Sequence, residues 1–151
     1  MSASPQAQLD GFLDKFLPEI ADRARGALAS MRQRLPGALE LVYDNYQALA
    51  IGYGPSERAS EAVFSIAVMP DRVSLIFTWG VGLPDPENRL GGEGNQVRHV
   101  RLPSPATLDE PAVQALMAEA LAQAKVPLDP AQPYRLIIKS ISAKQRPRRP
   151  R

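Results

Sequence analysis

The stretch AVFSIAVMPDRVSLIFTW, residues 62–79, carries the clearest structural signal in the chain. Apolar residues alternate with small or polar ones on both sides of the Met-Pro-Asp-Arg segment at 69–72. Successive side chains of a strand point to opposite faces, so each half has one apolar face. The apolar positions are Phe64, Ile66, Val68, Val73, Leu75, Phe77 and Trp79. Because proline suits the turn position that Pro70 holds, the stretch predicts a β-hairpin.

Helical periodicity lies on both sides of this hairpin. Residues 9–17 and residues 18–35 each repeat apolar side chains at the spacing of an amphipathic helix. Pro18 separates the two patterns and suits the first turn of the second helix, which Pro36 ends. A third pattern runs over residues 109–124. The sequence therefore predicts two helices before the strands and one after the hairpin.

Other strand-like stretches complete the predicted fold. LELVYDNYQALAIGYG at 39–54 predicts two short strands or one bent strand, and VRHVRL at 97–102 predicts another. YRLIIKSIS at 134–142 predicts a strand at a sheet edge. Strands that cluster without intervening helices argue against a doubly wound parallel sheet. We expect an α+β fold in two layers, with a mostly antiparallel sheet packed against the N-terminal and C-terminal helices.

Composition excludes several kinds of chemistry. The chain has 151 residues, 44% of them hydrophobic, which suits one domain, here residues 1–143. It has no cysteine and one histidine, so disulfides, thiolate zinc sites and multi-histidine metal centres within one chain are excluded. The N-terminal residues lack a secretory signal pattern, and no apolar run approaches the roughly 20 residues of a membrane span. We expect a cytoplasmic protein without a membrane partner.

The last eight residues, KQRPRRPR at 144–151, differ in charge from the rest. They hold five of the 18 basic residues, so 13 basic and 16 acidic residues remain in the body, a net charge of −3. The prolines oppose a helix, and we expect a disordered basic tail. Such a tail could contact nucleic acid nonspecifically through phosphates, but no nucleic-acid-reading motif precedes it.

A glycine cluster in RLGGEGNQVRHV, residues 89–100, invites comparison with phosphate-binding loops. Such loops deliver the phosphate to a helix N-terminus, whereas this stretch leads into a predicted strand and matches neither nucleotide-binding pattern. It therefore predicts a mobile hairpin loop. His99 lies between two arginines, whose charge lowers its pKa, so we expect a surface or packing residue rather than a general base.

The absence of a G-x-S-x-G or S-x-x-K nucleophile motif favours a non-enzymatic binding module for a small molecule or a protein partner. Trp79 lies where the hairpin meets the long loop, and we expect it to line a pocket. Tyr43 and Asn45 lie near a predicted strand end and could join the same pocket. Arg98 could attract an anionic ligand. These four residues are the predicted ligand-binding site.

Two carboxylate pairs are the alternative candidates. Asp10 and Asp14 are four residues apart, and Glu19 and Asp22 are three apart, so each pair shares one helix face. Such pairs can hold a hard cation through oxygen ligands. Basic residues are interleaved with them and oppose a cation: Lys15, Arg23 and Arg25. A solvated helix face is the favoured interpretation.

Several of these stretches resemble the YdhG-like family of bacterial domains of unknown function. They are LPGALELVYDNYQALAIGYG, VSLIFTWGVGLPDP, RLGGEGNQVRHVRL and DEPAVQALMAEAL, and the resemblance covers roughly residues 8–125. It implies a frataxin-like α+β domain. It also implies an alternative function, a frataxin-like iron chaperone that binds iron weakly through acidic helix residues. By position these would be Asp10, Asp14, Glu19 and Asp22, with iron as the one cofactor.

Overall fold

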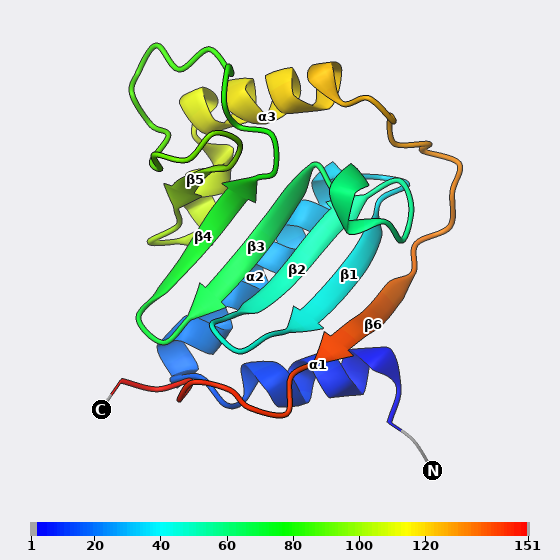
Figure 1. Cartoon of the computed structure of the whole chain (residues 1–151), viewed down its shortest axis with the longest axis vertical. Coiled ribbons are helices and arrows are strands. Elements are labelled where there is room, and N and C mark those ends of the chain that lie inside the picture. The colour runs from blue at the N-terminus through cyan, green and yellow to red at the C-terminus, as the bar shows by residue number, and fades with distance from the viewer. Residues whose placement is uncertain (1–2, 151) are drawn as a thin grey trace.

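The computed structural model describes residues 3–150, so residues 1–2 of the predicted domain and Arg151 of the predicted tail lie outside it. The helices are α1 (Pro5–Leu13), α2 (Pro18–Arg34) and α3 (Pro111–Gln123), with 3-10 helices η1 (Ala59–Glu61) and η2 (Pro105–Asp109). The strands are β1 (Leu39–Asp44), β2 (Leu49–Gly54), β3 (Phe64–Met69), β4 (Arg72–Phe77), β5 (Arg98–Arg101) and β6 (Leu136–Ile141). The predicted α+β fold is confirmed: helices flank one mostly antiparallel sheet (Figure 1).

The six strands lie in the order β5-β4-β3-β2-β1-β6. The predicted hairpin is confirmed, since β3 and β4 pair antiparallel from Phe64 opposite Phe77 to Met69 opposite Arg72. Residues 39–54 form two strands rather than one bent strand, and β1 pairs antiparallel with β2. The C-terminal strand does lie at an edge of the sheet, where β6 pairs with β1 in parallel.

One face of the sheet is buried under helices. Ile66 and Leu75 lie opposite each other across the hairpin and are fully buried on this face. Helix α2 crosses the same face, behind the sheet in Figure 1, and packs residues such as Leu28 and Met31 into the common core. The alternation of the strands thus places their large apolar side chains against α2.

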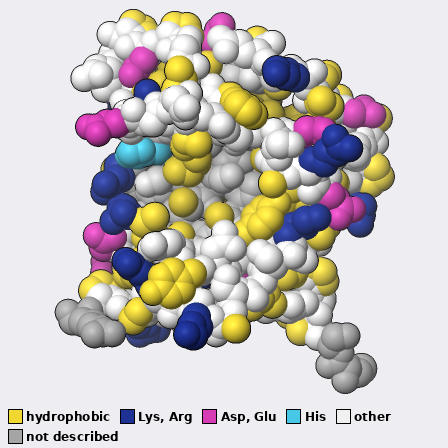
Figure 2. All heavy atoms as spheres, in the orientation of Figure 1, with side chains coloured by type: hydrophobic (Ala, Val, Ile, Leu, Met, Phe, Trp, Pro, Cys, Tyr) yellow, Lys and Arg dark blue, Asp and Glu magenta, His cyan; other side chains and the backbone are white. Residues whose placement is uncertain are grey.

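On the other face, the middle strands β2, β3 and β4 carry mostly smaller side chains. By alternation it presents Ala50, Ser65, Ala67, Ser74 and Ile76. Figure 2 views this face, in which the middle strands are recessed between larger apolar side chains. Segment 59–62 covers part of it, since Ala62 lies against Gly52 and Gly54 of β2. The two faces therefore differ in how much helical cover they have.

Helix α1 begins earlier than the apolar pattern of residues 9–17 predicted. Pro5 occupies its first turn, and the Ser4 hydroxyl accepts a hydrogen bond of 3.1 Å from the Ala7 N–H as the N-cap. The helix ends at Leu13, so Phe16 is buried in the connection before α2 rather than on a helix. No helix within residues 3–150 is long and apolar enough to cross a membrane.

The C-terminal segment lies against the domain, which differs from the predicted disordered tail. The N–H of Arg146 donates to the Tyr46 carbonyl at 2.9 Å, and the Arg149 guanidinium donates to the Lys15 carbonyl at 3.1 Å. Arg148 is buried, with 6% of its surface exposed. Composition alone suggested disorder because the charged side chains had no visible partners; the partners come from residues about 100 positions earlier in the chain.

Candidate functional site

Trp79 is the most exposed large aromatic side chain in the described chain, with 57% of its surface accessible. The predicted shared face with Phe77 is wrong, because β4 ends at Phe77 and Trp79 belongs to the turn that follows. At Gly80 the chain passes so close to Arg98 that an added Cβ would lie 2.5 Å from that side chain. This close approach leaves no room for a side chain at position 80 and requires glycine.

An apolar pocket of about 430 Å³ lies beside Trp79. Its walls come from η1 and the residues after it, from the end of β4, and from the C-terminal end of α3, which lies across one end of the strands in Figure 1. The apolar lining residues are Ala62, Val63, Phe77, Trp79, Ala120, Ala124 and Val126. The polar ones are Ser60, Glu61, Gln123 and Lys125. The indole N–H points to the Ser60 carbonyl, at 3.4 Å. The pocket thus has an apolar interior with a few polar groups, as small-molecule sites do.

The two charged residues of the pocket, Glu61 and Lys125, differ in whether they have partners within the described chain. The Glu61 carboxylate accepts a hydrogen bond of 2.8 Å from Ser56 and lies 3.8 Å from the Arg58 guanidinium. Lys125 is exposed, and no carboxylate of residues 3–150 lies within ion-pair distance of it. Lys125, the cation among the described residues that line the pocket, is therefore available to a ligand, whereas the Glu61 carboxylate already has partners.

The structure brings together only two of the four predicted ligand-binding residues. Trp79 and Arg98 are near each other, since Arg98 pairs with Phe77 across β4 and β5. Tyr43 and Asn45 lie at the opposite end of the strands. The register places Phe77, and hence Trp79, at the end of the sheet where β1 begins, whereas Tyr43 and Asn45 lie where β1 ends. The predicted shared pocket was wrong because the antiparallel order separates these ends.

The polar groups of these residues also have local roles. The Arg98 guanidinium donates to the carbonyls of Gly94 and Val97, at 2.7 and 2.8 Å, and so holds the glycine-rich loop. The Asn45 amide oxygen accepts from the Ser140 hydroxyl at 3.4 Å, which joins the β1 end to β6. The Tyr43 hydroxyl is buried and has no partner among the described residues.

The glycine-rich loop ends in a strand, as the sequence predicted. Gly92 adopts φ of +118°, which favours glycine, and Gly91 exchanges backbone hydrogen bonds with His99. The pKa of His99 is lowered, first by burial and then by the charges of Arg101 and Arg72. The loop leads to β5 and not to a helix N-terminus, so the geometry of a phosphate cradle is missing here.

The four acidic residues of the iron hypothesis do not converge. Asp14 pairs with Arg25 at 2.7 Å, Asp22 lies 3.9 Å from the same guanidinium, and Asp10 accepts from the Gln6 amide at 3.0 Å. Glu19 lies in the first turn of α2, where the helix dipole favours a negative charge. Across residues 3–150 there is no group of three or more His, Cys, Asp or Glu side chains placed to hold a metal ion.

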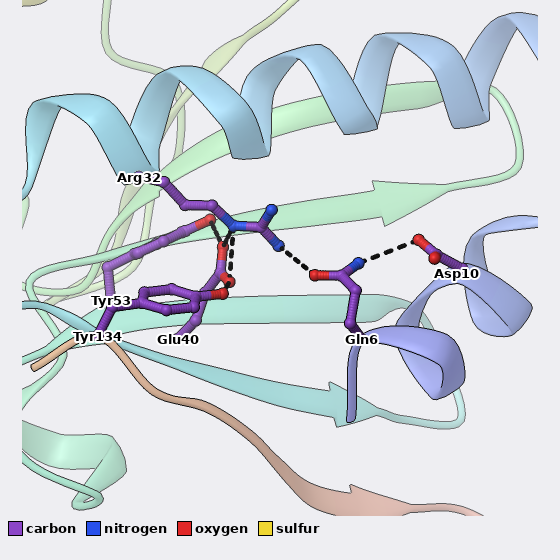
Figure 3. A network of polar contacts seen from close by, with 6 residues as sticks. All are labelled: Gln6, Asp10, Arg32, Glu40, Tyr53 and Tyr134. Atoms are coloured by element: carbon purple, nitrogen blue, oxygen red, sulfur yellow. Dashed lines mark hydrogen bonds and ion pairs between the residues drawn. The ribbon is translucent and has the colours of Figure 1, made fainter. Parts of the chain in front are cut away.

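Sequence reasoning missed a buried carboxylate network at Glu40 (Figure 3). The Glu40 side chain is fully buried, and its two oxygens each lie 2.9 Å from Arg32 Nε. The Tyr53 hydroxyl donates to it at 2.6 Å, and the Tyr134 hydroxyl donates to its other oxygen. Arg32 continues the network to the Gln6 amide at 3.2 Å. The signal was a glutamate at an inward-facing position of the apolar strand LELVYD.

The network suits anchoring better than proton transfer. Burial, reinforced by the neighbouring Glu40 carboxylate, raises the pKa of Tyr53 well above its ordinary value, and burial together with a hydrogen bond to Glu40 raises that of Tyr134. Both hydroxyls therefore stay protonated near neutral pH and act as donors. The partners of Glu40 come from α2, β2 and the segment before β6, and Arg32 extends the network to Gln6 of α1. The network therefore joins both ends of the described chain to the sheet.

In the comparisons with known proteins, no family model, no curated protein and no solved structure matches this chain. The resemblance to the YdhG-like family therefore stays a prediction.

Proposed function

We propose that this protein is a non-enzymatic binding module that takes a small apolar ligand in the pocket beside Trp79. The observation that carries the proposal is the combination of a 57%-exposed tryptophan with an adjoining apolar cavity of about 430 Å³. That volume lies in the usual range of small-molecule sites, roughly 300–1,000 Å³. An exposed indole next to a cavity leaves apolar surface in water, and a bound ligand would remove that surface from water.

The charges of the pocket favour a ligand with an anionic end. Lys125 has no ion-pair partner within the described chain, whereas Glu61 is held by Ser56 and Arg58. An apolar carboxylate could place its chain between Trp79 and α3 and its charge near Lys125. Since Lys125 is exposed, its contribution would be modest and would weaken as salt is added.

The chain's single tryptophan allows a direct test. Decanoate, decanol and decylammonium would be titrated while Trp79 fluorescence is recorded. We expect a saturable blue shift with decanoate at a lower concentration than with decylammonium. Absence of a saturable change with all three compounds would contradict the proposal.

A pocket-filling variant locates the binding event. Ala120 faces the pocket from α3, and Ala120→Leu places additional atoms there. We expect about tenfold weaker binding, equivalent to about 1.4 kcal/mol. Ala118→Leu is the matched control, because Ala118 is exposed on the same helix and does not line the pocket. Equal weakening by both variants would place the ligand elsewhere.

The predictions about location, family and iron binding are untested and remain predictions. A cytoplasmic location and membership of the YdhG-like family remain expectations from the sequence. Iron handling by Asp10, Asp14, Glu19 and Asp22 gains no support from their positions, since three of the four have partners within the chain.

A further inference from the structure

A second enclosed site lies at the other end of the strands from the Trp79 pocket. Asp44 ends β1, and only 1% of its surface is exposed. The Arg148 side chain from the C-terminal segment enters this site and is itself 6% exposed. In Figure 1 the C-terminal segment passes the ends of β1 and β2 next to α1. A carboxylate this deeply buried needs a partner, because an uncompensated buried charge is strongly destabilising.

The site surrounds the guanidinium of Arg148 on several sides. Nη2 lies 3.0 Å from the Asp44 Oδ1 and 2.6 Å from the Asn45 carbonyl, to both of which it donates. Nη1 lies 3.5 Å from the Tyr46 carbonyl. The ring of Phe16 covers the planar group, with its centroid 5.7 Å from the guanidinium carbon. A planar, multiply donating cation that stacks on a ring is what distinguishes arginine from lysine, so the geometry of the site suits arginine better than lysine.

The ion pair is only half formed. Asp44 Oδ2 and Arg148 Nε are both buried, and neither has a hydrogen-bond partner within residues 3–150. A bidentate pair would use these two atoms as its second bond. Arg148 is attached to a segment that has its own contacts at Arg146 and Arg149, which restrict how its side chain can turn. An arginine on a free peptide lacks that restriction and could complete the second bond.

The segment that carries Arg148 has further contacts, since the Arg146 N–H donates to the Tyr46 carbonyl and the Gln145 amide donates to the Asp44 carbonyl. Arg148 is nevertheless the one buried side chain within residues 144–150. Its neighbours Pro147 and Arg149 are exposed, and the prolines at 147 and 150 keep the backbone from forming a helix. The segment is basic, whereas residues 1–143 carry a net charge of −3. Arg148 is thus the most deeply buried of several contacts that hold an extended, basic segment on an acidic body.

We propose that the site formed by Asp44, the carbonyls of Asn45 and Tyr46, and the Phe16 ring recognises the arginine of a basic, proline-containing peptide segment. Residues 144–150 of this chain occupy that site in cis. The tethered segment competes with any external peptide at an effective concentration on the order of mM. The site therefore accepts an external arginine when its own segment is released.

Peptide binding to the full-length Arg148→Ala variant tests this proposal. The probe is the free peptide KQRPRRP, which has the sequence of residues 144–150. We expect saturable NMR shifts at the amides of residues 44–46 in Arg148→Ala, with wild-type binding about a hundredfold weaker because its own segment competes. A peptide with lysine at the fifth position should bind the variant about tenfold more weakly.

Two further variants make the result specific. Asp44→Asn combined with Arg148→Ala should lose peptide binding, because the buried carboxylate is gone. Lys144→Ala is the matched control: it removes the same charge from the same segment, and Lys144 is exposed and has no ion-pair partner within residues 3–150, so this variant should behave like the wild type. Folded Arg148→Ala that shows no shifts, or equal shifts with and without the Asp44 carboxylate, would overturn the proposal.

Loss of folding in Arg148→Ala would still be informative. A ligand that binds only the folded state stabilises it by mass action. The peptide should then restore folding and raise the Tm of Arg148→Ala in proportion to its concentration. Failure of the peptide to restore folding would also overturn the proposal. The Trp79 pocket is at the opposite end of the strands, so neither result depends on the function proposed there.

Discussion

Glu40 shows what a single buried charge does in this fold. Its carboxylate accepts from Arg32 and from the hydroxyls of Tyr53 and Tyr134, so the cost of burying it is offset by charge-assisted hydrogen bonds. Asp44, four residues later on the same strand and the same face, is the less satisfied counterpart, since one of its oxygens has no partner among the described residues. The first carboxylate joins α2, β2 and the segment before β6, and the second holds the C-terminal segment through Arg148.

The tyrosines around Glu40 predict a loss of stability at alkaline pH. Their pKa values are raised in the folded state, so the folded protein binds these protons more tightly than the unfolded chain does. This contribution is fully present below the unfolded tyrosine pKa of about 10 and is lost as pH rises through the higher folded values. The free energy of unfolding, measured by urea denaturation from about pH 8 to about pH 12, should fall over that window.

Variants separate this effect from general alkaline denaturation. Tyr53→Phe with Tyr134→Phe should be less stable at neutral pH, because Glu40 loses two donors. The same variant should show a shallower fall in the alkaline range. Tyr46→Phe is the control, since Tyr46 is exposed and does not contact Glu40. An unchanged slope in the double variant would contradict the assignment.

His99 predicts a second pH effect, with the opposite sign. Burial and the charges of Arg101 and Arg72 lower its pKa, so its NMR titration midpoint should lie below the ordinary value of about 6.5. As pH falls below that value, the unfolded chain gains a proton that the folded chain does not, and stability decreases. Arg101→Gln should raise the midpoint, whereas Arg58→Gln should leave it in place, because Arg58 is not among the charges that lower the pKa of His99. A midpoint unchanged by Arg101→Gln would contradict this account.

At the scale of elements, the β3–β4 hairpin organises the sheet and also positions the pocket. Its alternation places Leu75 against the helices and Ile76 on the less covered face. Its last residue, Phe77, contributes to the pocket wall, and Trp79 follows where the strand has ended. The same element therefore builds the core with one face and the candidate ligand site with its end.

Two adjacent substitutions on β4 should distinguish its faces. Leu75→Ala removes a fully buried side chain and should cost about 2–5 kcal/mol of unfolding free energy. Ile76→Ala changes a partly exposed position and should cost about 1 kcal/mol. Urea denaturation of both variants is the measurement. Equal costs would mean that the second face is packed as tightly as the first.

At the scale of the whole molecule, the strands separate two sites. The apolar pocket lies at the end near Trp79 and α3, and the arginine site lies at the end near Asp44 and α1 (Figure 1). Both chain ends meet around β1: Gln6 of α1 lies in the Glu40 network, β6 pairs with β1, and Arg148 reaches Asp44. The first and last segments of the chain therefore close the same edge of the sheet.

The local pattern of the sequence was sufficient to predict the hairpin, the three helices and the α+β class. Alternation and helical spacing depend on neighbouring residues, and a sheet with one apolar face needs a helical layer whatever its strand order. Trp79 was also recognised from its place between strand and loop. These features follow from residues within one turn or one strand of each other, where side-chain direction is set by local backbone geometry.

The pairing of distant segments could not be predicted in the same way. Tyr43 and Asn45 were assigned to the Trp79 pocket because nothing local reveals which strand end meets which. The buried networks join Glu40 to Tyr134 and Asp44 to Arg148, pairs separated by 94 and 104 residues. Such contacts arise when the burial of the core brings the chain ends together, so a tail that looks solvated in composition becomes partly buried in the folded protein.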